Sequence, residues 1–328
     1  APPYDVDTGG WTDGPADVPG AATDACGRTT TRMYAFTIDG RIPVVILVSP
    51  ADGAIVKPGT TLDVEVSDDN LAAVTVDVGA GPSPFSPPYD LATGGWADGP
   101  YSVTVRATDA AGNERVLAFA VTIDGTPPAL SRQDAGTVIP PGWDLVFLVV
   151  DAHLVAVTWT AGGPEADLPA PYALDTAGWA DGGYAVTIRA TDAAGNEATL
   201  DVAVIVDGTP PAVAVVDPVD LVRPGAVVRF SVSDLHLASV ESTIDGVTVP
   251  FPAPYEVDTA GWPDGRHELR VRATDEAGNE GLVTFAVTTD GTPPAIGELA
   301  IPTEVPSEIT VSVTEPHGPT LVALHWRV

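Results

Sequence analysis

Hydrophobic and polar residues alternate in short runs along much of the chain. Leu62, Val64 and Val66 alternate with polar residues, and the same pattern returns in SVTVRATD at residues 102–109. A period of two is typical of a half-buried β-strand. Glycine and proline interrupt every window long enough for a helix. The pattern therefore predicts an all-β protein with about seven short strands in each ~83 residues and almost no helix.

One stretch of about 40 residues, PYALDTAGWADGGYAVTIRATDAAGNEATLDVAVIVDGTPP around Tyr172, recurs near Tyr89 and Tyr255, with a divergent copy near Tyr4. Its landmark residues keep a spacing of 83 residues, as in Trp96, Trp179 and Trp262. Solenoid repeats usually have a period of about 20–50 residues, so this unit is too long to be one. It is large enough to form a domain with its own core.

We therefore predict an extended array of tandem immunoglobulin-like β-sandwich domains. Three complete units are expected at residues 41–125, 126–208 and 209–291. Residues 1–40 match only the second half of a unit in degenerate form, and residues 292–328 match only the first half. Each unit ends in the linker Asp-Gly-Thr-Pro-Pro, whose prolines favour a stiff joint.

The two half-units complement each other, and two explanations fit. Either the sequence is a window cut from a longer regular array, or the tail of one molecule completes the sandwich begun by the head of the next. Half a sandwich would expose its core and unpaired strand edges. Pro19 and Gly20 stand where other copies have a valine-rich strand, so this strand is expected to be weak, bulged or at an edge.

The chain is strongly acidic, with 45 Asp+Glu against 14 Lys+Arg and a formal net charge of −31. A negative field repels nucleic acid and anionic membranes, and it attracts cations. No run approaches the ~20 apolar residues of a membrane span, so no membrane insertion is expected for this segment. Cys26 is the single cysteine, which excludes an internal disulfide.

The pattern Y-x-x-D-T…W-x-D-G-x-Y-x-V-x-V-x-A-T-D-x-A-G-N-E…D-G-T-P-P resembles the tandem bacterial Ig-like domains of long cell-surface proteins and adhesins. The resemblance covers essentially the whole chain and is strong within each unit. Departures are Ala92 for the usual Asp and Arg28 for the usual Asn of the first copy. The resemblance implies an extracellular or cell-surface role in carrying load or displaying other domains. It identifies no ligand, because this fold serves many functions.

Aspartates gather where the predicted strands end. The second and sixth strands of each unit run in the same direction, so their terminal aspartates share the end at which the chain enters the domain. Stacking of domains would bring these residues to the junctions together with the linker aspartate and the aspartate of the Trp-x-Asp-Gly loop. The expected groups are Asp98, Asp124, Asp151 and Asp192 at one junction, Asp181, Asp207, Asp234 and Asp275 at the next, and Asp13, Asp39, Asp68 and Asp109 at the one before.

Clustered carboxylates repel one another unless a cation neutralises them, and Ca²⁺ prefers six to eight oxygen ligands. We therefore consider Ca²⁺ at the junctions as the one cofactor that the sequence suggests. The alternative is that these residues only cap turns, since Asp and Asn bond to their own backbone. His153 and His236 follow a strand-end aspartate by two residues. No nucleophile elbow repeats with them, so loop capping or a polar contact is favoured over catalysis.

The sequence thus favours a non-catalytic structural protein, an extracellular rod, stalk or filament of repeats. Its partners would be copies of itself or adjoining repeats of the same chain. An adhesin or carbohydrate-binding array is the second hypothesis, with cell-surface glycans as partners. The repeated Trp11, Trp96, Trp179 and Trp262 would then be sugar platforms, although their place in the same turn of every unit favours a core plug. A spacer region of an extracellular enzyme is the third.

Overall fold

The computed structural model describes residues 5–134 and 136–293 of the chain. Across this part all regular secondary structure is β-strand, with no helix. A membrane-spanning helix is accordingly absent from the described residues. The half-unit predicted at residues 292–328, with His317 and Trp326, lies almost entirely outside the described residues.

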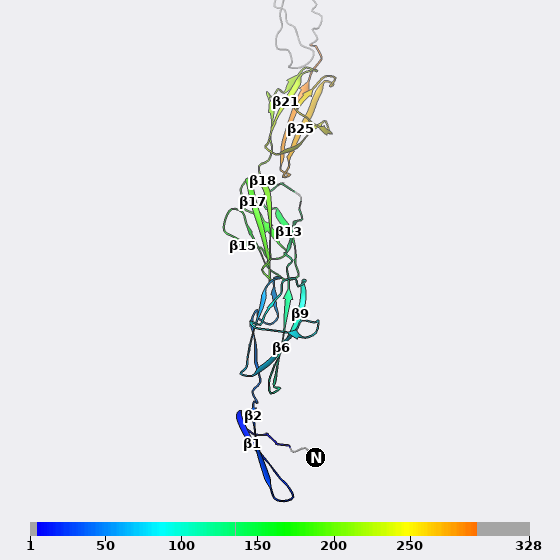
Figure 1. Ribbon diagram of the computed structural model, residues 1–328. Coiled ribbons are helices and arrows are strands. Elements are labelled where there is room, and N and C mark those ends of the chain that lie inside the picture. The colour runs from blue at the N-terminus through cyan, green and yellow to red at the C-terminus, as the bar shows by residue number, and fades with distance from the viewer. Residues whose placement is uncertain (1–4, 135, 294–328) are drawn as a thin grey trace, which may run out of the picture. The chain divides into compact units, whose positions relative to one another are not determined.

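The first complete repeat forms two sheets from eight strands (Figure 1). The strands are β3 (Val44–Ser49), β4 (Ala54–Val56), β5 (Thr61–Ser67), β6 (Leu71–Asp77), β7 (Ser83–Pro84), β8 (Asp90–Ala92), β9 (Gly99–Asp109) and β10 (Glu114–Ile123). One sheet has the order β3-β5-β8, and the other has the order β4-β10-β9-β6-β7. β4 pairs with β10 in parallel, whereas β9 pairs antiparallel with both β10 and β6. This is the arrangement of an immunoglobulin-like sandwich, as the alternation predicted.

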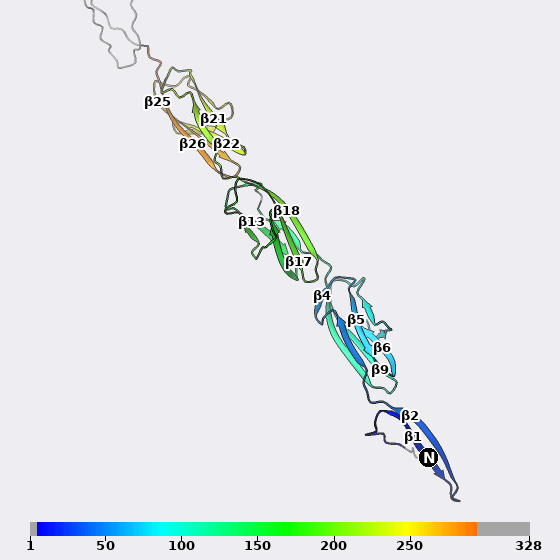
Figure 2. The same ribbon diagram turned by 90° about the vertical axis from the view of Figure 1, so that its left-hand side faces the viewer.

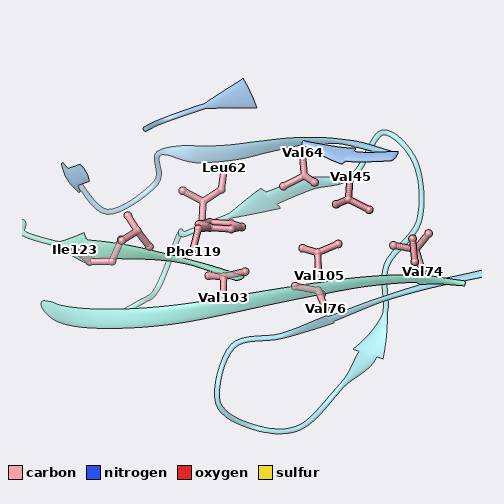
Figure 3. Packing of buried hydrophobic residues seen from close by; sticks show 11 residues of the cluster. Val45, Leu62, Val64, Val74, Val76, Val103, Val105, Phe119 and Ile123 are labelled. Atoms are coloured by element: carbon pink, nitrogen blue, oxygen red, sulfur yellow. The ribbon is translucent and has the colours of Figure 1, made fainter. Parts of the chain in front are cut away.

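The core lies between these two sheets. Leu62 and Val64 of β5 point toward Val103 and Val105 of β9 and Phe119 of β10 (Figure 3). All five side chains are at most 6% exposed. Because inward residues alternate with outward ones along each strand, the period-two pattern places every second side chain in the core.

Two further repeats have the same strand order (Figure 2). The middle repeat comprises β11 (Ala129–Arg132), β12 (Val138–Ile139), β13 (Asp144–Val150), β14 (Leu154–Thr160), β15 (Ala166–Asp167), β16 (Ala173–Asp175), β17 (Gly182–Asp192) and β18 (Glu197–Val206). The last comprises β19 (Ala212–Val216), β20 (Leu221–Val222), β21 (Val227–Ser233), β22 (Leu237–Ile244), β23 (Val247–Pro250), β24 (Glu256–Asp258), β25 (Gly265–Asp275) and β26 (Glu280–Thr289).

The repeated tryptophans border the cores. Trp96 and Trp262 are partly buried and pack against the buried residues of their own repeats. Trp96 also contacts Tyr101, with 4.5 Å between ring centroids, and Trp179 contacts Tyr184 at 4.4 Å. These contacts fit the role of core plug better than that of an open sugar platform.

The chain begins with an isolated hairpin of two strands, β1 (Gly14–Thr23) and β2 (Thr29–Ile38). It is the counterpart of the β9–β10 hairpin, because Gly14 pairs with Ile38 as Gly99 pairs with Ile123. The register runs through Pro19 and Gly20 without a shift. The bulge that was one of the expected outcomes is therefore absent from this hairpin, and both strands are edge strands among the described residues.

Core packing is testable with one substitution repeated on the two faces of the same sheet. Val105→Ala removes two methyl groups at a site with 0% exposure, whereas Val116→Ala removes them at a site with 42% exposure. We expect Val105→Ala to lower the free energy of unfolding of this repeat by about 2 kcal/mol. Val116→Ala should change it by less than about 0.5 kcal/mol. Hydrogen exchange of the β9 and β10 amides measures both, and equal effects would contradict the placement of the core.

Candidate functional site

The linkers between repeats carry the densest recurrent polar contacts. Three of these linkers begin at Asp39, Asp124 and Asp207, and they are named joints 1, 2 and 3. The described chain divides into two compact units. Joints 1 and 2 lie within one unit and joint 3 lies within the other. Each set of contacts below therefore belongs to a single unit.

Joint 2 is held from its N-terminal side by the Trp-x-Asp-Gly loop. The Asp98 carboxylate accepts hydrogen bonds from the Gly125 N–H at 2.9 Å and from the Thr126 hydroxyl at 2.6 Å. These bonds lower the pKa of Asp98, with the Thr126 hydroxyl as the larger cause and the Gly125 N–H as the next. Asp98 thus binds the linker backbone directly.

A glycine follows the linker aspartate because there is no room for a side chain. A Cβ on Gly125 would lie 2.9 Å from Pro58 Cγ and 3.3 Å from Asp98 Oδ1. The same contacts recur at other linkers, where Asp181 binds Gly208 and Thr209 at 2.9 and 2.5 Å, Asp264 binds Gly291 and Thr292 at 2.6 and 2.5 Å, and Asp13 binds Gly40 at 2.9 Å. The motif Asp-Gly-Thr is therefore the partner of the Trp-x-Asp-Gly loop.

Joint 2 is held from its C-terminal side by the Ala-Gly-Asn loop between β17 and β18. The Asn196 side-chain amide donates to the Asp124 backbone carbonyl at 3.0 Å and to the Asp192 carboxylate at 2.7 Å. Asp192 also accepts the Asn196 N–H at 2.8 Å. Burial acts to raise the pKa of Asp192, but the hydrogen bonds from Asn196 and the loop N–H groups outweigh it and leave the pKa lowered.

The same amide contact recurs at the other two joints. Asn113 donates to the Asp39 carbonyl at 2.9 Å, and Asn279 donates to the Asp207 carbonyl at 2.8 Å. The first hairpin has Arg28 at the corresponding position, where it donates to the Asp24 carboxylate at 2.8 Å. The asparagine of the Ala-Gly-Asn loop therefore both caps its own turn and connects two repeats.

The carboxylate of each linker aspartate has a partner from the loop that follows β5, β13 or β21 of the next repeat. His153 Nδ1 lies 2.6 Å from Asp124 Oδ2, His236 Nδ1 lies 2.8 Å from Asp207 Oδ2, and Asn70 donates to Asp39 Oδ2 at 2.8 Å. The histidines are thus polar contacts at the joints, in agreement with the sequence prediction.

Three groups of potential metal ligands result, with the ligand atoms of each group within 4.8 Å of one another. They are Asp39, Asp68 and Asp109 at joint 1, Asp124, Asp151 and Asp192 at joint 2, and Asp207, Asp234 and His236 at joint 3. The sequence predicted that the members of the first two groups would meet, but it also placed Asp13, Asp98 and Asp181 with the groups at their joints, and these three aspartates instead bind the linker glycines. His236 was not among the residues expected at joint 3, and Asp275 there binds its own loop through Asn279.

The three groups differ in how well they suit a hard cation. Joint 1 offers three carboxylates beside the Asn70 amide, an all-oxygen ligand set of the kind that Ca²⁺ prefers. At joints 2 and 3 a histidine ring already contacts the linker carboxylate. The groups at joints 1 and 2 thus offer carboxylate oxygens alone, whereas the group at joint 3 includes a His236 nitrogen, and at joint 1 the contact to the linker carboxylate comes from the Asn70 amide instead of a histidine.

Sequence reasoning missed two groups that hold the linkers, the asparagine amide and the threonine hydroxyl. Thr126, Thr209 and Thr292 stand beside the linker prolines, and no pattern in the sequence singles out their hydroxyl groups. Their hydroxyl groups donate to Asp98, Asp181 and Asp264. The available signal was that each motif recurs with the other at a fixed separation, 27 residues from Asp98 to Gly125 and again from Asp181 to Gly208.

No protein-family model matches this sequence, and no curated protein matches it either. Solved structures of tandem β-domains do resemble it. The fibronectin(III)-like modules of Clostridium thermocellum CbhA align with 17% identity and a TM-score of 0.35 over 50% of this chain and 94% of theirs. A tetra-tandem repeat from the extending region of a large adhesion protein aligns with 21% identity and a TM-score of 0.36 over 88% and 84%. The protocadherin GammaB4 extracellular domain aligns with 16% identity and a TM-score of 0.31 over 95% and 62%.

Acid should loosen the joints through the Trp-x-Asp-Gly aspartates. The pKa values of Asp98 and Asp181 lie below the ordinary value of 3.8, chiefly because of the threonine hydroxyls. A lowered folded-state pKa favours the closed joint at every pH above the ordinary value, and this contribution disappears as the pH falls through the folded-state pKa. We expect the joints to stay closed above about pH 4 and to open below it. Carboxyl chemical shifts measured by NMR against pH test this.

The matched control for this titration is Thr126→Val, which removes the hydroxyl and keeps the side-chain shape. It should move the pKa of Asp98 upward and leave the pKa of Asp181 unchanged. An Asp98 pKa that does not respond to Thr126→Val would contradict the assignment of its cause.

Proposed function

We propose that this chain is a non-catalytic, extracellular structural protein, a rod, stalk or filament of Ig-like repeats whose linkers are held in fixed geometry. One observation carries the proposal. At each of the three joints the Asp-Gly segment is bound by the repeat before it, through Asp13, Asp98 or Asp181, and by the repeat after it, through Asn113, Asn196 or Asn279.

The hydrogen bonds of the linker's backbone N–H groups support a stiff linker. At joint 2 the Asp124 N–H donates to the Val56 carbonyl, and the Gly125 and Thr126 N–H groups donate to Asp98 and Asp124. The next two residues are prolines, which have no N–H and a fixed φ. Every backbone donor from Asp124 to Pro128 is therefore either bonded or absent. Bending the joint would break bonds on both sides.

Composition supports an extracellular or cell-surface location. The net charge of −31 keeps long arrays apart and soluble. The sandwiches are closed by core packing and by joint contacts, without an internal disulfide, since Cys26 is the single cysteine. Reach and stiffness, rather than chemistry at a pocket, are the properties that such repetition provides.

An adhesin or carbohydrate-binding role is the second candidate, and a groove at joint 3 favours it. This groove has a volume of about 880 Å³ and is lined by Asp207, Leu235 and His236 among others. Leu235 is 88% exposed, and the corresponding residues of the other repeats are Asp69 and Ala152. Saturable binding of a glycan that is lost in Leu235→Ser would support this role over a purely structural one.

We also propose that Ca²⁺ binds at joint 1. Three carboxylates whose oxygen atoms lie within 4.8 Å of one another repel electrostatically, and a divalent cation offsets that repulsion. The histidine contacts at joints 2 and 3 supply a donor to the linker carboxylate where joint 1 supplies the Asn70 amide. An amide can turn its oxygen toward a cation, whereas a histidine ring cannot offer oxygen.

Loss of the joint contacts should broaden the distribution of distances between adjacent repeats. We expect the double variant Thr126→Val/Asn196→Ala to release joint 2 from both sides, with Asn196→Ala alone costing about 1 kcal/mol of joint closure. Electron–electron double resonance between one spin label in residues 41–125 and one in residues 126–208, in a Cys26→Ser background, measures the distance distribution.

The control for this experiment is Thr104→Val/Gln133→Ala, which makes the same types of change away from joint 2. It should keep the narrow distribution of the parent chain. A parent chain with a distribution as broad as that of the Thr126→Val/Asn196→Ala variant would remove the proposal of a stiff array.

Calcium should raise the melting temperature of the chain through joint 1. A ligand at 100 times its Kd stabilises the bound fold by about 2.7 kcal/mol. We expect Asp68→Asn to abolish the rise, while Asp69→Asn, a neighbouring acid outside the ligand group, should retain it. A midpoint that is the same with Ca²⁺ and with EDTA would remove the metal from the proposal.

A further inference from the structure

The repeat at residues 209–291 has a histidine, His267, where the other two complete repeats have Tyr101 and Tyr184. This side chain lies near the start of β25, is 7% exposed and contacts Trp262, with 4.6 Å between ring centroids. Each tyrosine hydroxyl donates to the backbone carbonyl four residues earlier, and His267 Nε2 lies 3.0 Å from the equivalent carbonyl of Pro263. The histidine therefore ties the Trp-x-Asp-Gly loop to the strand, as the tyrosines do in the other repeats.

Asp245, in the turn between β22 and β23, stands where the other repeats have Gly79 and Gly162. All three residues have a left-handed backbone, with φ values of 46°, 100° and 80°. A residue other than glycine is strained in this region, and such strain often marks a side chain with a role. The Asp245 carboxylate accepts the Glu268 N–H at 2.9 Å and lies 2.7 Å from His267 Nδ1. The strained aspartate thus occurs in the same repeat as the histidine that it contacts.

Both ring nitrogens of His267 face oxygen acceptors. The Pro263 carbonyl has no proton to give, so Nε2 carries one. The Asp245 carboxylate already accepts from Glu268, and its pKa is lowered, chiefly by the bond from His267, so the proton between Asp245 and Nδ1 resides on the ring. His267 is therefore an imidazolium with two N–H donors, whereas a neutral imidazole has one.

The surroundings of the ring contain one charged contact, Asp245. On β26 the paired residue is the apolar Val287. In the loop before β25, Asp264 directs its carboxylate to the next linker, where it accepts from Gly291 and Thr292. The charged residues of β25 beside Asp245 are exposed on the other face of the strand, and they are Arg266, Glu268 and Arg270.

The hydrogen bond to Asp245 raises the pKa of His267 above its ordinary value of 6.5, with the bond to Pro263 as the next cause, and burial opposes both. A folded-state pKa above the unfolded value stabilises the fold fully below about pH 6.5, and this contribution is lost as the pH rises through the folded-state pKa. Loss of one ring proton leaves a nitrogen lone pair facing either the Asp245 carboxylate or the Pro263 carbonyl. One of the two bonds then breaks.

We propose that His267 and Asp245 form a pH-dependent latch on the Trp-x-Asp-Gly loop of residues 209–291, closed in mild acid and released as the pH rises. This loop carries Asp264, which binds the following linker at Gly291. Release of the latch therefore loosens the hold of this repeat on that linker. The latch lies within one repeat and does not depend on the stiffness of the array.

The protonation of His267 can be measured on the full chain from the NMR chemical shifts of its ring nitrogens against pH. In the wild type both nitrogens should carry a proton up to a midpoint above pH 6.5. Asp245→Gly installs the residue of the other repeats and removes the carboxylate, so it should lower the midpoint by about one pH unit or more. Asp217→Gly is the matched control, because Asp217 belongs to the same repeat and also has a positive φ, 53°. It should leave the midpoint unchanged.

Hydrogen exchange of backbone amides measures the effect on the repeat. Protection of β25 and β26, corrected for the intrinsic exchange rate, should fall as the pH rises through the His267 midpoint, by at most about tenfold per pH unit. Protection of β9, β10, β17 and β18 should stay constant, because their repeats have neither residue of the latch. The double variant Asp245→Gly/His267→Tyr reproduces the residues of those repeats, so it should fold and lose the pH-dependent fall.

A wild-type His267 midpoint at or below pH 6.5 overturns the proposal. Equal midpoint shifts in Asp217→Gly and Asp245→Gly overturn it too, because the effect would then come from the backbone instead of the carboxylate. An equal loss of protection in all three repeats, or a fall that persists in the double variant, would assign the response to groups other than His267 and Asp245.

Discussion

The structure depends on how the backbone N–H and C=O groups of a short linker find hydrogen-bond partners. The Asp-Gly-Thr-Pro-Pro segment passes from one sandwich to the next, and at joint 2 its first residue continues the sheet ladder through the Asp124 N–H and the Val56 carbonyl. Its carbonyl and N–H groups are bonded by Asp98 from one side and Asn196 from the other, and its prolines remove the remaining donors. Asp124 and Asn196 are buried, and an unpaired polar group costs free energy where water is excluded, so one placement of the linker against the Asn196 loop is favoured.

This requirement accounts for where the repeats of this chain agree with one another. The three complete copies share Trp-x-Asp-Gly, Ala-Gly-Asn and Asp-Gly-Thr-Pro-Pro, the segments that meet at the joints. They differ at Asp69, Ala152 and Leu235, which flank the joint, and in the outward residues of the strands. The core needs only apolar residues of suitable size at alternating positions. The joint needs particular donors at particular places, so it tolerates less variation.

Much of this architecture could be predicted from the sequence because strand alternation and strand direction are local properties. The alternation at Leu62, Val64 and Val66 gave the sandwich, and the direction of the strands ending at Asp151 and Asp192 gave the acidic group at joint 2. The roles of Asn196 and Thr126 could not be predicted in the same way. Their partners are a backbone carbonyl and a loop carboxylate of another repeat, and no periodicity encodes such a contact.

The first hairpin departs from the other copies at the residue that would meet a preceding linker. In the complete repeats this loop binds the carbonyl of the preceding linker through its asparagine, and the loop Asp24–Arg28 has Arg28 at that position. Its guanidinium pairs with Asp24 in the isolated chain. Five N–H donors allow it to bind a second carboxylate as well. An arginine at this position therefore holds the turn through a charged pair with Asp24, where the complete repeats hold it through the neutral amide of an asparagine.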